Sequence, residues 1–213
     1  MDFIFFTDEK IFTVAPPVNL QNDRVYVPAM TKPAMTKKRE VAADRLLRTR
    51  STFSKLIMVS VAVSKFRCSG LVFVQPGTKV NGAYYRDELL SKQLLPAIRH
   101  IAGDTYVFQQ DSAPSHQARY TIAFLANETP QFIGLDLWPP NSPDLNPVDY
   151  KLWGVMQERV YQKPIQDIDD LKRRLIAAWS GIHQQVIDQA IDQWRERLRA
   201  CVKAGERHFE HLL

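Results

Sequence analysis

Residues 138–149 read WPPNSPDLNPVD, a run of prolines and turn formers that ends in the signal for a new helix. Asn146 has the side chain of an N-cap, Pro147 fits the first helical position, and Asp149 lies in the first turn, where a carboxylate suits the helix dipole. From here the chain reads as helical to its end. Apolar residues recur at helical spacing at Leu171, Leu175, Trp179, Val186, Ala190, Trp194 and Leu198.

The part of the chain before this run alternates between strands and helices. An apolar segment at residues 3–14, interrupted by polar residues 7–9, predicts a strand that is buried on both faces and broken by a polar site. An N-cap at Asn81 starts a helix that Pro96 should kink or shorten. Further strands are expected at 24–28, 55–63, 71–74, 105–109 and 132–137, and helices at 81–100 and 115–127. This order predicts one α/β domain over residues 1–213, a mixed sheet flanked by helices with a helical C-terminal part.

Composition excludes several classes of protein. The 213 residues are 45% hydrophobic with only eight glycines, which excludes disordered and collagen-like chains. Two cysteines are too few for a disulfide framework or a cysteine-rich zinc module. The longest apolar stretch, Leu56–Val63, is too short to span a bilayer, and the N-terminus has no signal-peptide pattern. We therefore expect an intracellular protein without a membrane partner.

The positive charge is concentrated in one segment. The chain carries +5 overall, but residues 31–55 contain eight basic residues against two acidic ones, so this segment carries +6 and the rest −1. Such a segment suits a polyanion such as DNA, although a solvated loop is an equal alternative. The candidate DNA contacts are Lys37, Lys38, Arg39, Arg45, Arg48 and Arg50. A second basic stretch, at Arg195, Arg197, Arg199, Lys203 and Arg207, reads better as a solvated helix face.

Three aspartates stand at positions where chemistry is expected. Asp8 interrupts the first strand, Asp111 follows the strand at 105–109, and Asp149 lies in the opening turn of a helix. Each alone could be a turn or capping residue. Together, carboxylates converging from strand ends repel one another unless a cation lies between them, and oxygen ligands favour Mg²⁺ or Mn²⁺. Two such ions promote in-line phosphoryl displacement, so the aspartates and the basic segment independently indicate a metal-dependent nuclease.

Three blocks of sequence resemble the signature blocks of the mariner superfamily of DNA transposases. They are FTDEK at residues 6–10, QDSAPSH at 110–116, and the run at 138–149, while AGERHF at 204–209 resembles a typical ending. The resemblance implies a ribonuclease-H-like catalytic domain in which Asp8, Asp111 and Asp149 bind two Mg²⁺ or Mn²⁺ ions for cut-and-paste transposition. It needs no small-molecule cofactor.

The resemblance also indicates a subtype and the remaining parts of the protein. The intervals between the three aspartates are 102 and 37 residues, as in the rarer group with a third aspartate and a longer second interval. Family members carry two helix-turn-helix modules before this domain, and Asp8 leaves no room for them, so we expect a fragment or a truncated gene that cannot dock on transposon ends specifically. In the family, the stretch that residues 16–54 occupy here clamps a partner subunit, which implies a homodimer, and the setting is the nucleus.

Two single residues and two alternative functions complete the expectations. His116 could contact DNA or lie near the metals, or it could be an ordinary surface or capping histidine, and Trp138 is expected to pack under the site. The expected function is cleavage of DNA at transposon ends and joining of the freed 3′-hydroxyl to target DNA. The alternatives are an inactive DNA-binding or dimerising remnant, and a ribonuclease-H-like nuclease without strand transfer.

Overall fold

The central strand of the sheet is also the first element of the chain. The computed structural model describes residues 2–15, 54–134, 137–139, 142–205 and 209. In this part, five strands occur in the order β3-β2-β1-β4-β5. β1 pairs with β2 and β2 with β3 in antiparallel fashion, whereas β1 with β4 and β4 with β5 are parallel. The strands are β1 (Ile4–Thr13), β2 (Leu56–Val63), β3 (Val72–Val74), β4 (Val107–Gln109) and β5 (Gln131–Phe132).

The predicted interruption of the first strand is wrong. β1 runs unbroken through its polar residues, and Asp8 lies opposite Val61 in the antiparallel ladder. Backbone pairing does not depend on side-chain polarity, so polar residues can continue a strand where their side chains find partners. Alternation then sends neighbouring side chains to opposite faces of the sheet, so Asp8 and Glu9 diverge.

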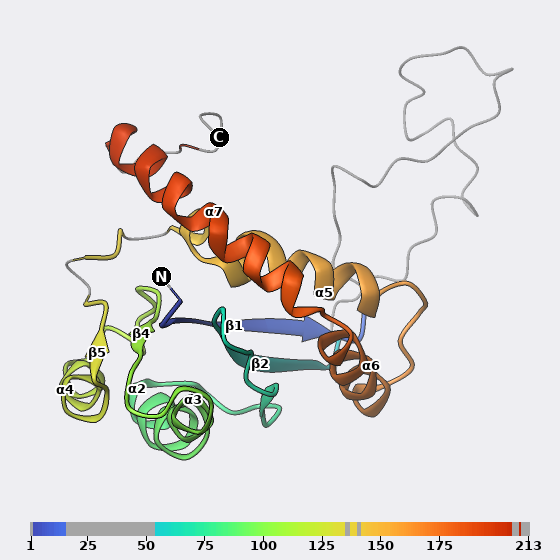
Figure 1. The fold of residues 1–213 in the computed structure, drawn as a ribbon. Coiled ribbons are helices and arrows are strands. Elements are labelled where there is room, and N and C mark those ends of the chain that lie inside the picture. The colour runs from blue at the N-terminus through green and yellow to red at the C-terminus, as the bar shows by residue number, and fades with distance from the viewer. Residues whose placement is uncertain (1, 16–53, 135–136, 140–141, 206–208, 210–213) are drawn as a thin grey trace, which may run out of the picture.

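Helices cover both faces of this sheet (Figure 1). One face carries α5, α6 and α7, which bury Phe6, Phe12 and the odd-numbered residues Ile57, Val59 and Val61 of β2. The other face carries η2 and α3, packed on Phe5 and Ala62. The helical elements are α2 (Gly82–Tyr84), η2 (Tyr85–Leu94), α3 (Leu95–Ala102), α4 (Arg119–Glu128), η3 (Pro143–Leu145), η4 (Val148–Leu152), α5 (Trp153–Val160), α6 (Ile168–Ser180) and α7 (Gln184–Lys203).

The mixed sheet flanked by helices and the helical C-terminal part are confirmed, with differences at the ends of elements. Asn81 caps its helix as predicted by accepting the Tyr84 N–H, but Pro96 does not end it. Instead Pro96 lies in the first turn of α3, directly after the ten-residue π-helix η2, where proline is tolerated. α4 begins later than predicted and β5 is shorter. The strand expected at 24–28 and the basic clamp-like segment lie outside the described residues.

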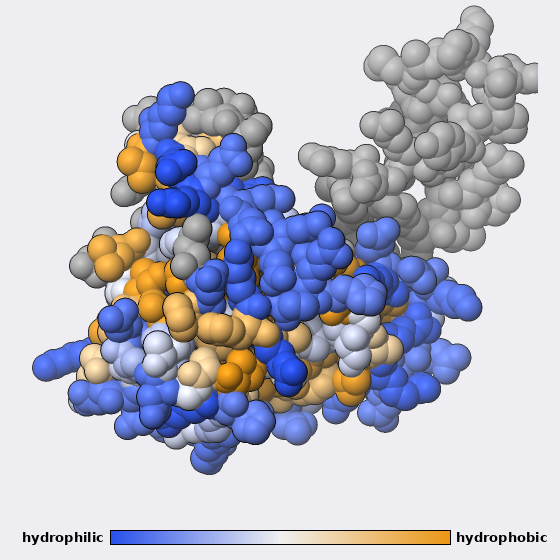
Figure 2. Space-filling model, in the orientation of Figure 1, coloured by the Kyte–Doolittle hydropathy of each residue, from blue (hydrophilic) through white to orange (hydrophobic). Residues whose placement is uncertain are grey.

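The outer surface of α7 is mostly hydrophilic, as expected for a helix with one buried stripe (Figure 2). The buried residues of α7 are Ile187, Ala190, Ile191, Ala200 and Cys201. None of the helices in the described ranges is both long enough and apolar enough to cross a membrane.

Candidate active site

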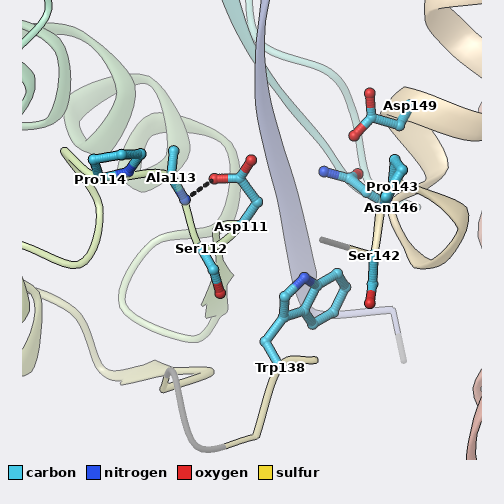
Figure 3. Close-up of a pocket in the computed structure, with 9 residues that line it drawn as sticks. All are labelled: Asp111, Ser112, Ala113, Pro114, Trp138, Ser142, Pro143, Asn146 and Asp149. Atoms are coloured by element: carbon cyan, nitrogen blue, oxygen red, sulfur yellow. Dashed lines mark hydrogen bonds between the residues drawn. The ribbon is translucent and has the colours of Figure 1, made fainter. Parts of the chain in front are cut away.

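A cavity of about 420 Å³ lies where the ends of β4, η3 and η4 approach one another. Asp111 stands on one side of it and Asp149 on the other, with Trp138 between them at the rim (Figure 3). Trp138 is 5% exposed and packs on Leu145, which confirms that it packs at the site. The cavity is lined by Asp111, Ser112, Ala113, Pro114, Trp138, Ser142, Pro143, Asn146 and Asp149.

Hydrogen bonds tie together the three segments that carry the predicted aspartates. The Asn146 side chain donates to the Thr7 carbonyl (3.0 Å) and accepts the Val148 N–H (3.1 Å), so it joins the start of the helix to β1 beside Asp8. The Thr7 hydroxyl donates to the Gln109 carbonyl (2.7 Å) and so joins β1 to β4. Asn146 therefore acts as the predicted cap and also fixes the position of the helix that carries Asp149.

Asp8 and Asp149, which we call the acid pair, lie close enough for the charge of Asp149 to act on the pKa of Asp8. Asp8 is 6% exposed, and its Oδ2 accepts the indole N–H of Trp153. Burial, followed by the negative charges of Asp149 and Glu9, raises the pKa of Asp8 from 3.8 to about 9. Burial also raises the pKa of Asp149, against the nearby charge of Lys10. Burial and mutual repulsion thus disfavour the ionised form of the acid pair when no added cation is present.

Asp111 belongs to a different arrangement, which we call the histidine bridge (Glu9, His116 and Asp111). The His116 ring is 3% exposed; its Nδ1 lies 2.5 Å from Asp111 Oδ1 and its Nε2 lies 3.2 Å from Glu9 Oε2. Burial alone would lower the pKa of His116, but its hydrogen bonds to the two carboxylates raise it to about 10. Burial likewise opposes ionisation of Asp111, yet the hydrogen bond and charge of His116 bring its pKa below the usual value. The histidine bridge therefore holds a cation of its own.

Further contacts hold the His116 ring in place. The ring lies against Tyr85, with centroids 4.1 Å apart. The Tyr85 hydroxyl donates to Gln110 Oε1 (3.1 Å), and the Gln110 amide donates to the His116 carbonyl (3.3 Å). On the opposite end of the bridge, the Ser60 hydroxyl donates to Glu9 Oε1 (2.6 Å). The bridge is thus fixed from η2, β2 and the loop after β4.

The oxygen donors suit the predicted ions in kind. Asp8, Asp111 and Asp149 offer carboxylate oxygens only, which Mg²⁺ and Mn²⁺ prefer. Among the described residues, however, no group of three or more His, Cys, Asp or Glu side chains is arranged to hold a metal ion. Asp111 is instead engaged by His116, apart from the acid pair. Shared ligation by all three aspartates stays a prediction.

The basic residues named from the sequence have separate outcomes. Lys37, Lys38, Arg39, Arg45, Arg48 and Arg50 lie outside the described residues. Both ring nitrogens of His116 face carboxylates, which places this residue in the acidic site rather than on an exposed surface. In α7, Arg197 is not part of a solvated face, since its guanidinium lies 3.8 Å from the Tyr150 ring centroid and donates to the Asp144 carbonyl (3.0 Å).

Sequence reasoning missed Glu9, Ser60, Tyr85 and Trp153 as site residues. Two of them carried a usable signal. Glu9 follows Asp8 in a strand, where alternation turns it to the opposite face. Trp153 lies four residues after Asp149, where a helix brings side chains together. Ser60 and Tyr85 carried none, because only the strand register and the packing of η2 bring them to the site.

The chain is similar in sequence to several curated transposases. No protein-family model matches the chain. It is 27% identical over 203 residues to the Tc3 transposase of Caenorhabditis elegans, covering 94% of this chain and 55% of that protein, and 30% identical over 119 residues to the Tc1 transposase of the same organism, covering 56% and 42%. The chain thus spans about half the length of the curated relatives it matches.

Solved structures of the Mos1 mariner transposase share the fold. Its catalytic domain matches with a TM-score of 0.69 at 21% identity, covering 98% of this chain and 85% of that one. Its paired-end complex with Mn matches with a TM-score of 0.77 at 23% identity, covering 98% and 57%. The chain therefore shares the fold of the Mos1 catalytic domain, with the mixed sheet flanked by helices that its sequence predicted.

Proposed function

We propose that this chain is the catalytic core of a Tc1/mariner-like transposase, which cleaves phosphodiesters at transposon ends and joins the 3′-hydroxyl to target DNA. One observation carries the proposal: Asp111 and Asp149 line one cavity, and the buried Asp8 lies near enough to Asp149 to feel its charge, although the three come from distant segments of the chain. They do so in the fold of Mos1, whose structures include a complex with a transposon end and a strand transfer complex.

Divalent ions are part of this proposal. Mos1 structures with Mn and with Mg support Mn²⁺ or Mg²⁺ as the ion, and the acid pair and Asp111 would hold two of them. Such ions, when bound, activate an attacking oxygen and stabilise a leaving oxygen. The chain's own residues contribute orientation: Asn146 fixes the Asp149 helix on β1, and His116 fixes Asp111. Burial, followed by the charges of Asp149 and Glu9, raises the pKa of Asp8, and a bound cation would favour the ionised form that these effects oppose.

The proposed partners follow from the same reading. DNA is the substrate, a second copy of the chain forms a homodimer, and the protein acts in the nucleus. The basic residues between 31 and 55 are proposed to contact DNA or the second subunit.

Substitution of the three aspartates tests the proposal. In nicking of supercoiled plasmid with Mn²⁺, Asp8→Asn, Asp111→Asn and Asp149→Asn should each lower the rate at least about 100-fold, because a lost ligand removes several kcal/mol of transition-state stabilisation. Asp104→Asn, at an exposed aspartate outside the site, is the matched control. Electron paramagnetic resonance of Mn²⁺ should show weaker Mn²⁺ binding by these three variants but not by Asp104→Asn. A site variant that cleaves and binds Mn²⁺ like the control would remove its residue from the site.

Joined products separate the proposed function from its alternatives. Incubation of an oligonucleotide bearing a free 3′-hydroxyl with plasmid and Mn²⁺ should give covalently joined DNA. Nicked plasmid without joined products would indicate a nuclease without strand transfer. DNA binding with neither product would indicate an inactive remnant.

A further inference from the structure

Trp153 lies at the junction of η4, which contains Asp149, and α5. The backbone N–H of Trp153 donates to the Val148 carbonyl and closes the π-helical turn of η4, and Trp153 is also the first residue of α5. Asp149 precedes it by four positions, and residues at this spacing lie on the same side of a helix. π-helical turns of this kind are frequent at functional sites.

The indole of Trp153 reaches across to β1. Its Nε1–H donates to Asp8 Oδ2, and the side chain is 1% exposed. The ring packs edge-to-face on Phe12, with centroids 5.9 Å apart. A ring held on both sides in this way has no freedom to turn, so the direction of its N–H is fixed by the core.

The consequence concerns the orientation of Asp8. One helix supplies both a carboxylate, Asp149, and the donor that holds the carboxylate on β1. Asp111 is oriented by the same principle, since its Oδ1 accepts both the Ala113 N–H (2.9 Å) and His116 Nδ1. In each case donors of the protein hold one carboxylate oxygen, Oδ2 of Asp8 and Oδ1 of Asp111.

We propose that Trp153 is a positioning residue, which fixes Asp8 through its indole N–H so that the remaining oxygen of Asp8 stays beside Asp149 for cation binding. This inference rests on the proposed function, because it assigns a role toward the ions that the aspartates would hold. Donors that orient metal-ligating side chains commonly affect metal affinity or activity by about 10–100-fold.

The chain offers a matched control in Trp179. This residue is also buried, at 6% exposed, in the same hydrophobic cluster as Trp153, and its indole N–H donates to the Ser69 carbonyl (2.8 Å). Replacement by Phe removes one buried indole N–H and a similar volume at either position. Of these two tryptophans, Trp153 is the one whose indole N–H donates to a candidate metal ligand, Asp8.

The experiment compares Trp153→Phe and Trp179→Phe in the full chain. Mn²⁺ affinity is measured by electron paramagnetic resonance, plasmid nicking gives the rate, and thermal melting reports the shared packing loss. We expect Trp153→Phe to weaken Mn²⁺ binding and slow nicking about tenfold or more. Trp179→Phe should remain within about twofold of the wild type in both, although both variants melt lower. Equal behaviour of the two variants, with wild-type protein that binds Mn²⁺ and nicks DNA, would overturn the inference and leave the proposed function standing.

A second measurement covers the case in which Trp153→Phe fails to fold. In ¹H–¹⁵N spectra of the indole groups without metal, Asp8→Asn should move the Trp153 signal and leave the Trp179 signal in place. An unmoved Trp153 signal would show that the contact is absent and would also overturn the inference. A wild-type protein that binds no Mn²⁺ would overturn the proposed function and this inference together.

Discussion

The acid pair and the histidine bridge contain the same kind of carboxylate but have opposite electrostatic balance. In the acid pair, burial and neighbouring charges raise the pKa of Asp8 to about 9, and the hydrogen bond that opposes this comes from the neutral indole of Trp153. In the histidine bridge, a buried imidazole whose pKa is raised to about 10 compensates Glu9 and Asp111. In this site, therefore, the carboxylates beside the imidazole are stable in their ionised form, whereas Asp8, which has no such cation, is not.

The difference begins with two adjacent residues. Asp8 and Glu9 follow each other in β1, and strand alternation sends one to the face covered by α5 and the other to the face covered by η2. His116 lies on the Glu9 side, so only that side receives a built-in cation. The acid pair is left as the place where an added cation would have the larger effect.

Removal of the bridge's cation should have the largest effect. His116→Ala leaves the largely buried Glu9 and the partly exposed Asp111 without their partner, which should lower the free energy of unfolding by about 3–5 kcal/mol, as measured by urea denaturation at pH 7. Nicking should slow about 10–100-fold because Asp111 loses its support. His100→Ala removes an exposed histidine and should change stability by less than about 0.5 kcal/mol. Similar losses in the two variants would mean that His116 does not neutralise the bridge.

An effect of intermediate size is expected on the pH dependence of stability, which depends on Asp8 of the acid pair. Because the folded-state pKa of Asp8 is raised from 3.8 to about 9, its contribution is fully present below about pH 4 and is lost as the pH rises toward 9. Asn mimics the neutral acid, so the stability of Asp8→Asn should not depend on ionisation at this position. In EDTA, its free energy of unfolding should therefore rise relative to that of the wild type by about 1.4 kcal/mol per pH unit, or roughly 3 kcal/mol between pH 5 and 7. Urea titrations across this range measure the difference. Parallel curves for the two proteins would show that Asp8 ionises normally.

The smallest effect is expected at the outer end of the bridge. Ser60→Ala removes the hydroxyl that donates to Glu9 Oε1, which should lower the free energy of unfolding by about 1 kcal/mol. Ser91→Ala, at an exposed position of η2, is the control and should be nearly neutral. Thermal melting of both variants makes the comparison. A loss at Ser60 as large as that of His116→Ala would mean that the bridge depends on β2 more than on the imidazole.

The elements that carry the aspartates could be predicted because their signals are local. A carboxylate directly after a short apolar strand, and an Asn-Pro start of a helix, are readable from a few neighbouring residues. The predicted break in the first strand is wrong because polar side chains do not interrupt backbone pairing, and the ladder with β2 continues through Asp8. Prediction also failed at β5 and at the start of α4, where short elements are set by packing against distant residues.

The amino-acid sequence was enough to indicate most of the strands and helices. It placed Asp8, Asp111 and Asp149 at element ends or in a strand where they could meet, since periodicity and capping act over a few residues. The partner of each aspartate came from the folding of distant segments onto one another: Trp153 donates to Asp8, and His116 contacts Asp111. Burial and the strength of a charge depend on everything that surrounds a group in space, and that surrounding comes from segments more than a hundred residues apart in the chain.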